Sequence, residues 1–481
     1  MEKFYVTTPI YYVNARPHIG SAYTTIAADV LARYWRGKLG DDQVFFLTGT
    51  DEHGAKVAES AVKEGKTPEQ FTDEVSAQFR AAWQKLNISH NDFLRTTEER
   101  HKIGAQKFLS LLHEKGALYE DQYEGLYCIG CERFLTEKEL VDGKCPLHNT
   151  VPEKIQEKNY FFKLKEWLPK VKEAIEQDKI KIQPEWAKKE VLGLFKQDLA
   201  DFSVSREKVQ WGIPLPWDES QRIYVWVEAL TNYLTAIGYG SDEEKVKQWW
   251  PAQYHLMAKD ILKFHAVYWP AMLLAADLPL PEAEFIHGFF TVNGQKMSKS
   301  LGNAIDPNAL VDQYGADATR YLLLAQFPFG QDGDIKEEAF AEQYQAALAN
   351  GLGNVVARVT KMVEQYLDGE IDASVAIDDF THFPTEIGQA IEQLDFFTAL
   401  QKLQQAISLI DEEIEKVKPW QLAKEEKSEE LRSALSRYIL CLRTLHPLVS
   451  PFMPEAGEKM RQQLEAEKIV KGEGLFPRIV A

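Results

Sequence analysis

The chain has 481 residues, enough for two to four domains with an ample hydrophobic core. Its formal net charge of −18, from 55 basic and 73 acidic side chains, argues against non-specific nucleic-acid binding through a broad basic surface. No stretch is apolar enough to span a bilayer, and residues 1–4 lack the basic and apolar regions of a secretory signal, so we expect a cytoplasmic protein.

The first elements along the chain are predicted to form a βαβ unit. Residues 4–13 are rich in aromatic and β-branched types, as a buried strand would be, and residues 44–47 form a second apolar run. Between them, apolar residues recur at intervals of three and four over 19–34, which predicts an amphipathic helix that Gly40 ends. The turn at 14–20 would therefore present the unpaired N–H groups of a helix start, which suits it to phosphate.

Two residues of this turn add to its suitability for phosphate. Gly20 lets a ligand approach the backbone closely, and His18 can donate a hydrogen bond to a phosphate oxygen as negative charge develops there. The run His-Ile-Gly-Ser that begins at His18 is weak evidence alone, because such short runs recur in unrelated proteins. Its position between a predicted strand and a predicted helix gives it weight.

A second phosphate-binding candidate is the run Lys-Met-Ser-Lys-Ser that begins at Lys296. It follows a predicted strand at 285–292 and lies between Gly294 and Gly302, as a loop able to open and close would. Lys296 and Lys299 can place two ammonium charges on one triphosphate. A match to five specified residues arises by chance in on the order of one in 10^4 unrelated chains of this length. A plain surface lysine pair would explain the charges but not the glycines and serines.

Three of the four cysteines and one histidine have the spacing of a zinc site. Cys128 and Cys131 are separated by two residues, as are Cys145 and His148, and each pair suits a tight knuckle. Four such ligands fill a tetrahedral coordination sphere, so we expect a structural ion. A disulfide reading would leave an odd cysteine and fits a reducing cytosol poorly. Cys441 lies in an apolar helical run and is expected to be an inert buried thiol.

The carboxyl-terminal third of the chain is predicted to be helical. Strand patterns fade beyond Glu337, and long helical patterns follow at 346–367, 387–418 and 428–445. These segments predict an α-helical bundle.

The two lysine- and histidine-bearing motifs together resemble the paired motifs of class I aminoacyl-tRNA synthetases. More narrowly, further segments are similar to methionyl-tRNA synthetases of the bacterial type with one zinc site, and they occur in the same order. These segments are Thr8-Pro9-Ile10-Tyr11-Tyr12-Val13-Asn14, Thr50-Asp51-Glu52-His53-Gly54, Trp211-Gly212-Ile213-Pro214, Tyr224-Val225-Trp226 and Lys259-Asp260-Ile261.

The resemblance, together with the predicted elements, implies an α/β fold. We expect a Rossmann-like parallel-sheet catalytic domain with a zinc-containing insertion, followed by an α-helical bundle domain. The expected ranges are 1–115 for the first half of the catalytic domain, 116–222 for the insertion, 223–340 for the second half with the lysine loop, and 341–481 for a helical anticodon-binding domain.

The activity implied is that of a methionine–tRNA ligase. Such an enzyme uses ATP with Mg²⁺ to convert L-methionine into methionyl-adenylate, and then transfers the methionyl group to the 3′ end of tRNA(Met). The resemblance makes His18, Lys296 and Lys299 catalytic, and it assigns ATP binding to Asn14, His18, Gly20, Ser21, Asp260, Lys296 and Lys299. The chain stops without the added dimerisation domain of some family members, which favours a monomer.

The resemblance also implies two further binding regions. A methionine side chain is apolar and polarisable, so an aromatic pocket suits it. The pocket residues implied by position are Ile10, Tyr12, Asp51, Trp226, Ala229, Leu230, Tyr233, Ile261, Phe264, His265 and Trp269, with Asp51 taking the ammonium group. Singly, each aromatic residue is more often part of a core than of a ligand wall. The implied anticodon-reading residues are Asn354, Arg358 and Trp420, and Arg206 is implied to couple the site to the acceptor end of the tRNA.

Three positions depart from the family pattern. Ser21 replaces the second histidine of the usual motif, Ala258 stands where glycine is frequent, and Glu228 stands where aspartate is common. Two alternatives remain open at this point. A synthetase for isoleucine or leucine would share both motifs but usually carries a larger editing insertion. A non-catalytic zinc-containing RNA-binding protein derived from a synthetase would be expected to have lost the lysine loop.

Overall fold

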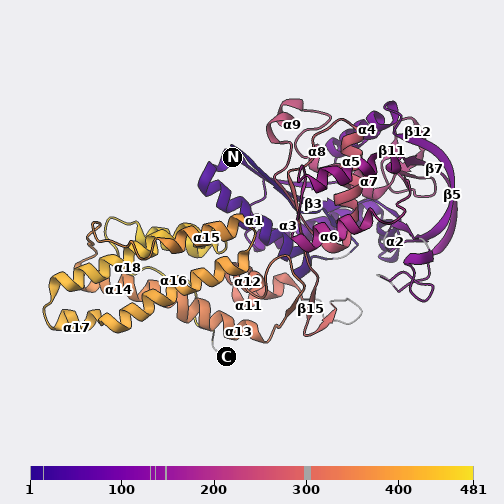
Figure 1. Cartoon of the computed structure of the whole chain (residues 1–481). Coiled ribbons are helices and arrows are strands. Elements are labelled where there is room, and N and C mark those ends of the chain that lie inside the picture. The colour runs from indigo at the N-terminus through magenta and orange to yellow at the C-terminus, as the bar shows by residue number, and fades with distance from the viewer. Residues whose placement is uncertain are drawn as a thin grey trace. The chain divides into compact units, whose positions relative to one another are not determined.

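The computed structural model describes residues 2–14, 16–130, 132–135, 137–146, 149–296 and 305–479. The chain forms two compact units, whose elements are labelled in Figure 1. The first unit comprises Met1–Pro17, Val44–Ala81 and His90–His287. The second comprises His18–Gln43, Ala82–Ser89 and Gly288–Ala481, so the segment that begins at His18 belongs with the carboxyl-terminal part of the chain.

A parallel sheet forms the centre of the first unit. Its strands run in the order β8-β14-β13-β1-β3-β4. The short strand β2 pairs with the carboxyl end of β3, past the residues of β3 that pair with β1. All residues of β1 and β3 are buried, as in a parallel sheet that is covered on both faces. The strands are β1 (Phe4–Thr7), β2 (Tyr11–Tyr12), β3 (Val44–Asp51), β4 (Asp92–Arg95), β8 (Lys181–Gln183), β13 (Tyr254–Ala258) and β14 (Ala283–His287).

The predicted parallel sheet is therefore confirmed, with changes in where its strands end. The predicted strand over 4–13 is two strands, and Pro9 lies between them, where it has no N–H group to donate to a neighbouring strand. The strand predicted at 44–47 continues to Asp51. Its register with β1 aligns Phe4 with Val44.

Helices of varied length connect these strands along the chain. They are α2 (Ala55–Lys63), α3 (Pro68–Lys85), α4 (Glu99–Glu114), α5 (Leu164–Glu176), α6 (Glu185–Leu194), α7 (Val225–Leu230), α8 (Asn232–Thr235), α9 (Glu243–Trp249) and α10 (Trp269–Ala275), with the short turns η3 (Lys259–Ile261) and η4 (Phe264–Tyr268). Their apolar faces form one large core in which Phe108 of α4 packs against Trp269 of α10, with ring centroids 5.7 Å apart.

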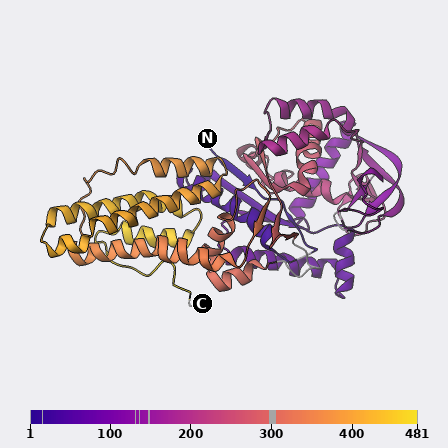
Figure 2. The same ribbon diagram turned by 60° about the horizontal axis from the view of Figure 1, so that its bottom comes forward.

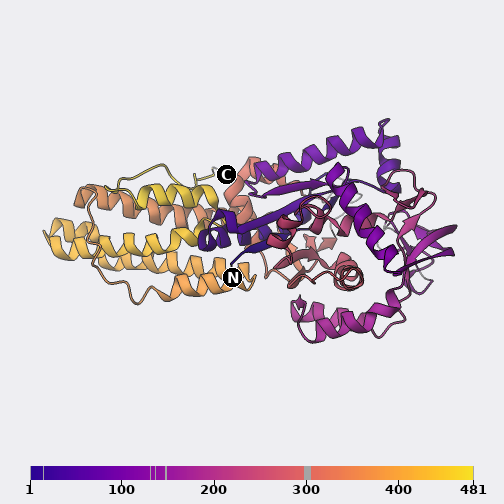
Figure 3. The same ribbon diagram turned by 90° about the horizontal axis from the view of Figure 1, so that it is seen from above.

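Antiparallel strands form the rest of the first unit. A long antiparallel ribbon of β5 and β7 lies at the outer end of the first unit, at the right of Figure 3, and β6 and β9 flank it. The small sheet β10-β12-β11 follows in the chain. The strands are β5 (Leu118–Cys128), β6 (Arg133–Leu135), β7 (Glu153–Phe162), β9 (Phe202–Ser203), β10 (Ser205–Arg206), β11 (Pro214–Leu215) and β12 (Asp218–Ile223). Although β8 lies within residues 116–222, it pairs with β14 in the parallel sheet.

The second unit begins with α1 (Ile19–Leu39). This helix ends where the sequence predicts, at Gly40, whose φ of 94° is a conformation that favours glycine. The strand predicted over 285–292 is divided at Gly288, because β14 belongs to the parallel sheet and β15 (Phe290–Val292) to a separate one. A side chain at Gly288 would clash with the backbone nitrogen of Asp332, since the Cβ position lies 2.4 Å from it.

The small sheet of the second unit joins β15 to β16 and β17. It has β16 (Gln295–Lys296) on one side of β15 and β17 (Gly333–Ile335) on the other. The helices of this unit are α11 (Pro307–Tyr314), α12 (Ala316–Leu324), α13 (Ala339–Gln343), the π-helical η6 (Tyr344–Leu352), α14 (Gly353–Leu367), α15 (His382–Glu392), α16 (Phe396–Val417), α17 (Pro419–Lys424), α18 (Ser428–Val449) and α19 (Pro454–Leu464).

The predicted helical bundle is confirmed, and α14, α15, α16 and α18 lie side by side in it (Figure 2). The pattern over 387–418 is interrupted at Leu394, which has a φ of 60°, and Asp395 then begins α16 by accepting a hydrogen bond from the backbone N–H of Thr398. Cys441 is buried in α18, as predicted, and burial raises the pKa of its thiol to about 12. In the described part of the chain, no helix is long and apolar enough to cross a membrane.

A buried ion cluster connects α1 to the helices of the second unit. Arg320 of α12 and Asp29 of α1 are both fully buried, and their charged atoms lie 2.7 Å apart. Arg320 also donates to the carbonyl oxygens of Pro451 and Phe452, each at 2.8 Å. Arg33 contributes a second cation to Asp29 at 2.7 Å. The guanidinium groups and Ser89 outweigh the effect of burial and lower the pKa of Asp29 to about 2.

Candidate active site

His18 is the N-cap residue of α1. Its ring Nδ1 accepts a hydrogen bond from the backbone N–H of Gly20 at 3.0 Å. A ring that accepts at Nδ1 carries its proton on Nε2 in the neutral form, so Nε2 is a hydrogen-bond donor. The first turn of the helix thereby fixes the orientation of the imidazole ring.

Ser21 has a clear structural role in the same turn. Its hydroxyl accepts from the backbone N–H of His18 at 3.2 Å and lies 2.8 Å from the carbonyl oxygen of the same residue. His18 and Ser21 therefore form a reciprocal capping arrangement that fixes the helix start. A serine in place of the usual histidine is thus accommodated by a hydrogen-bonded helix cap.

The lysine loop is only partly described. The backbone of Lys296 ends β16, while residues 297–304, with Lys299 among them, lie outside the described residues. The described chain resumes at Ile305, whose carbonyl oxygen accepts a hydrogen bond from the backbone N–H of Ile19 at 3.2 Å. The residue that follows the loop therefore contacts the residue that follows His18, within the second unit.

In the first unit, Asp51 stands at the carboxyl end of β3. Its register partner Tyr12 ends β2, and the half-buried Asn14 follows in the adjoining turn. Asp260, in the turn after β13, is exposed. The carboxyl ends of parallel strands are where open α/β sheets bind ligands, so these residues lie where a site is expected.

Asp51 is a buried carboxylate with unmet hydrogen-bonding capacity. It is 7% exposed, and within the described part of the chain its Oδ1 has no hydrogen-bond partner. Burial, together with the negative charges of Glu228 and Glu132, raises the pKa of Asp51 well above its ordinary value. A bound ammonium group would supply both the missing donors and the missing positive charge.

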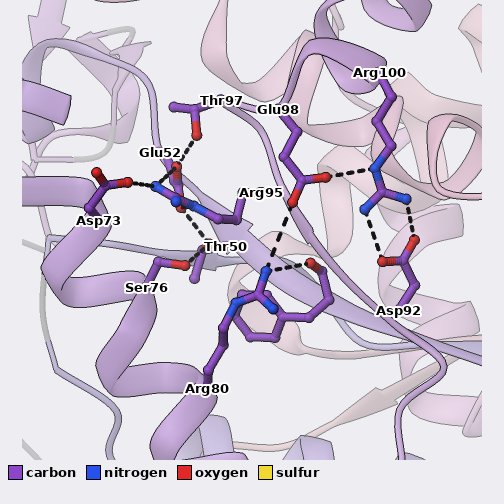
Figure 4. A network of polar contacts seen from close by, with 11 residues as sticks. Thr50, Glu52, Asp73, Ser76, Arg80, Asp92, Arg95, Thr97, Glu98 and Arg100 are labelled. Atoms are coloured by element: carbon purple, nitrogen blue, oxygen red, sulfur yellow. Dashed lines mark hydrogen bonds and ion pairs between the residues drawn. The ribbon is translucent and has the colours of Figure 1, made fainter.

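The next residue, Glu52, takes part in a polar network, shown in Figure 4. Its carboxylate is fully buried and forms two hydrogen bonds with Arg95, at 2.8 and 3.0 Å. Thr50 also donates to this carboxylate at 2.7 Å, and Arg95 reaches Asp73 of α3 at 2.6 Å. The network anchors the segment that carries Asp51, so Glu52 is a structural residue.

His53 points toward α7. Its Nδ1 lies 2.8 Å from one oxygen of Glu228, and His101 Nε2 lies 2.7 Å from the other oxygen. Glu228 is fully buried, and burial alone would raise its pKa, but the two histidines outweigh this effect and lower it. The glutamate found where aspartate is common thus connects α7 to both α4 and the Asp51 segment.

The predicted aromatic wall is assembled from α7 and the chain after β13. Trp226 and Phe264 stack with ring centroids 4.1 Å apart. His265 Nε2 lies 2.7 Å from the hydroxyl of Tyr233, and its Nδ1 lies 3.1 Å from the carbonyl oxygen of Ile261. Burial lowers the pKa of His265 to about 4, so the ring is neutral at physiological pH.

Most of the other predicted pocket residues pack in the same core. Tyr233 and Trp269 are 1% and 0% exposed, with ring centroids 6.2 Å apart, so in this structure both are core residues. Leu230 belongs to this core, Tyr12 and Ile261 pack against it, and Ala229 is buried beside Leu230 on α7. Ile10 is half-buried near Gly49, where its Cγ2 lies 3.0 Å from the position of an added Cβ.

A small cavity of about 10 Å³, room for about one water molecule, lies next to Gly54, and the sequence did not predict all of its lining. Arg206 contributes its guanidinium, which packs 4.0 Å from the ring centroid of Tyr224. Glu132 is the unforeseen member, because it follows a cysteine pair to which only a structural role was assigned. The cavity is lined by Gly54, Tyr127, Glu132, Arg206, Val209, Trp211, Ile223, Tyr224 and Val225.

Comparison with known proteins identifies the family. The family described as tRNA synthetases class I (M) matches residues 4–151 and 137–360. The methionine–tRNA ligase of Clostridium acetobutylicum is 42% identical over 99% of this chain and 78% of its own length. The chain belongs to the class I methionyl-tRNA synthetase family. The corresponding ligase of Thermotoga maritima is 39% identical over 100% of this chain and 81% of its own length.

Solved structures of this family also match the whole chain. Mycobacterium tuberculosis methionyl-tRNA synthetase in complex with methionyl-adenylate has 34% sequence identity, covers 99% of this chain and 100% of its own, and gives a TM-score of 0.92. The apo form of the same enzyme has 31% identity, covers 100% and 99%, and gives a TM-score of 0.86. The α/β fold with a helical carboxyl-terminal region is thus that of a methionyl-tRNA synthetase.

The metal ligands expected of this synthetase family are placed in part. Cys128 and Cys145 are buried in one small cluster with Leu135, while Cys131 and His148 lie outside the described residues. Two thiols in one buried cluster, on chain segments with knuckle spacing, fit a structural zinc.

The anticodon candidates of this synthetase lie on two helices of the second unit. Asn354 and Arg358 are one turn apart on α14, and Trp420 is half-buried on α17. Arg358 forms ion pairs with Asp411 and Glu415 of α16, each at 2.6 Å. A base that Arg358 contacts would have to compete with these carboxylates.

Proposed function

We propose that the chain is a methionine–tRNA ligase that activates L-methionine with ATP and transfers it to tRNA(Met). The observation that carries this proposal is the buried carboxylate of Asp51, whose Oδ1 has no partner in the described part of the chain. In a chain of this family, a buried carboxyl group at the carboxyl end of β3 suits the ammonium group of an amino acid. The neighbouring aromatic wall suits a thioether side chain.

The first step proposed is adenylate formation. The methionine carboxylate attacks the α-phosphorus of ATP, a phosphorus–oxygen bond to the carboxylate forms, and pyrophosphate leaves. Negative charge develops on phosphate oxygens, so preorganised donors dominate catalysis. We assign these roles to His18 through Nε2–H and to Lys296 and Lys299, with Mg²⁺ accompanying the nucleotide.

The remaining contacts to ATP follow the family pattern. We assign the adenosine ribose to Asp260, whose exposed carboxylate can accept from hydroxyl groups. Asn14 is assigned to the reacting phosphates, and Gly20 to close backbone approach. Ser21 is assigned to ATP binding, because its hydrogen bonds with His18 stabilise the start of α1.

In the second step, the terminal ribose hydroxyl of the tRNA attacks the methionyl carbonyl carbon. The ester forms and AMP leaves with the electron pair of the broken mixed-anhydride bond. We propose that Arg206 helps to couple the site to this acceptor end, and that Asn354, Arg358 and Trp420 read the anticodon. Unpaired bases stack on aromatic rings, and amide and guanidinium groups read base edges.

Further features of the proposed enzyme concern its metal and its state in the cell. We propose a zinc ion held by Cys128, Cys131, Cys145 and His148, which would fix the turn between β5 and β6 and take no part in bond making. The domain ranges stay as proposed, with 341–481 as the anticodon-binding domain. We also propose that the enzyme is a cytoplasmic monomer.

Amino-acid-dependent exchange between ATP and labelled pyrophosphate tests the substrate assignment. With saturating ATP, methionine should support exchange about 100-fold better than leucine or isoleucine, because branched side chains fit a pocket for an unbranched thioether poorly and even a one-methylene misfit gives about 10 to 200-fold. Exchange that is faster with leucine or isoleucine than with methionine would overturn the assignment. Asp51→Asn should raise the KM for methionine and leave the KM for ATP nearly unchanged.

A further inference from the structure

Glu132 has a backbone conformation that calls for an explanation. Its φ is 51°, in the left-handed region that non-glycine residues rarely adopt. It stands directly after Cys131, in the turn between β5 and β6. Residues are held in such conformations where the surrounding structure requires them, often at functional sites. The acidic side chain is buried, with Glu132 only 3% exposed.

The buried carboxylate of Glu132 accepts three hydrogen bonds within the first unit. The hydroxyl of Tyr12 donates to Oε1 at 3.0 Å, and the backbone N–H of Lys56 donates to the same oxygen at 2.6 Å. The hydroxyl of Tyr127 donates to Oε2. Glu132 is therefore a connection between the cysteine turn, the strand end that carries Tyr12, and the start of α2.

The bond to Lys56 fixes the segment that contains Asp51. Helix α2 begins at Ala55 after Gly54, and Gly54 supplies no side-chain cap. The Glu132 carboxylate caps the helix instead, because it accepts a hydrogen bond from the backbone N–H of Lys56 in the first turn, where a negative charge is favourable. Gly54 permits the approach: its φ is 106°, and a Cβ there would lie 2.8 Å from Glu132 Oε1 and 2.9 Å from the Tyr12 hydroxyl.

We propose that Glu132, in the turn between β5 and β6 of the first unit, is a positioning residue of the methionine pocket. It acts through Tyr12, whose ring it orients by the hydroxyl, and through the start of α2, three residues beyond Glu52. This inference rests on the proposed function, because Tyr12 and Asp51 are assigned there to methionine. It gives the turn that bears two of the cysteines a role in substrate affinity as well as in structure.

The test is a double-mutant cycle on methionine binding to the full chain, measured by calorimetry without ATP. Glu132→Ala and Tyr12→Phe should each raise the Kd for methionine about tenfold, the scale of losing one hydrogen bond to a charged group. Because both changes break the same link, the double variant should bind like the weaker single one. Glu132→Gln keeps an oxygen acceptor for Tyr12 and Lys56 and should bind within about threefold of the original chain.

The controls separate positioning from general damage. Glu137→Ala removes an equal charge from the exposed start of the following turn and should leave the Kd unchanged. At saturating methionine, kcat for pyrophosphate exchange should be nearly the same in Glu132→Ala and Glu132→Gln. If Glu132→Ala does not fold, Tyr12→Phe alone carries the test, because it breaks the link and leaves the other two bonds of Glu132 in place.

The outcomes distinguish this inference from the function on which it rests. If Asp51→Asn leaves the Kd for methionine unchanged, the proposed pocket itself is wrong. If Asp51→Asn weakens binding but Glu132→Ala does not, only the positioning role is wrong. Independent, multiplying effects of Glu132→Ala and Tyr12→Phe would also overturn it, because they would show that the two residues do not act through each other.

Discussion

Asp51, at the end of β3, and the two residues that follow it have three different roles, which depend on what surrounds each side chain. Glu52 is neutralised by Arg95, and His53 is held by Glu228. Asp51 alone among the three keeps a buried carboxylate oxygen without a partner in the described part of the chain. The two anchored residues hold the third rigidly, which lowers the entropy lost when a ligand binds.

The raised pKa of Asp51 predicts a pH dependence of methionine binding. Below that pKa the carboxyl is protonated and cannot pair with an ammonium group, so affinity should rise with pH as the proton is lost. The Kd for methionine should fall as the pH rises from the ordinary carboxyl range toward the raised pKa of Asp51, and binding should release a proton to the buffer. Calorimetry in two buffers of different ionisation enthalpy measures both effects. A Kd that is flat with pH in the original chain and in Asp51→Asn would contradict this role.

The same group also affects stability when no ligand is bound. The folded chain retains the Asp51 proton at pH values where the unfolded chain has released it. The free energy of unfolding therefore falls as pH rises from the ordinary carboxyl pKa toward the raised one. Bound methionine would relieve this effect by pairing the carboxylate.

At this scale, the sequence predicted residue types better than their partners. The assignment of Asp51 came from resemblance, and its unpaired oxygen fits that role. Glu132 was missed because its importance depends on a left-handed backbone turn and on contacts with residues 76 and 120 positions away. The capping role of Ser21 is local, three residues from its partner, and an acceptor three positions after an N-cap was a readable signal.

At the scale of elements, periodicity placed the helices well and their ends less well. The sequence pattern predicted α1 correctly, because apolar residues recur with helical spacing from Ile19 and Gly40 ends the helix. The break at Leu394 was missed because neither glycine nor proline marks it. Strand β8 was missed because three residues at a sheet edge carry too little pattern to be recognised.

The buried pair of Asp29 and Arg320 should dominate the stability of the second unit. Arg320→Met removes the cation and leaves Asp29 buried with less compensation, at a cost of about 3–5 kcal/mol in the free energy of unfolding. Urea denaturation followed by circular dichroism measures the change. Arg461→Met, which breaks an exposed pair with Glu458, is the matched control and should leave the midpoint unchanged. Equal midpoints for the two variants would show that the cluster is not important for stability.

The cysteine turn should contain one zinc ion per chain. Metal analysis of the purified protein measures this content directly, and Cys145→Ser should lower it because a thiolate ligand is lost. The variant should also unfold at a lower temperature, since the ion would fix the turn after β5. Retention of a full equivalent of zinc by Cys145→Ser would show that the ligand set is wrong.

At the scale of the whole molecule, amino-acid activation and tRNA recognition should be separable by mutation. Activation is assigned to His18, Asp51 and the lysine loop, and anticodon reading to α14 and α17. Trp420→Ala should therefore raise the KM for tRNA(Met) in aminoacylation about tenfold or more, the scale of losing a stacked base. Pyrophosphate exchange without tRNA should stay unchanged. A fall in pyrophosphate exchange with no change in the KM for tRNA(Met) would show that Trp420 does not read the anticodon.

The central claim is that His18 and Lys299 act on the same triphosphate. It is supported by the hydrogen bond from the backbone N–H of Ile19, next to His18, to the carbonyl oxygen of Ile305, which follows the lysine loop. The most direct test is the rate of methionine-dependent pyrophosphate exchange in Lys299→Ala. This variant should be slower by about 100-fold or more, with methionine binding unchanged, because a charge-stabilising donor is lost. Exchange at the original rate in Lys299→Ala would contradict the claim.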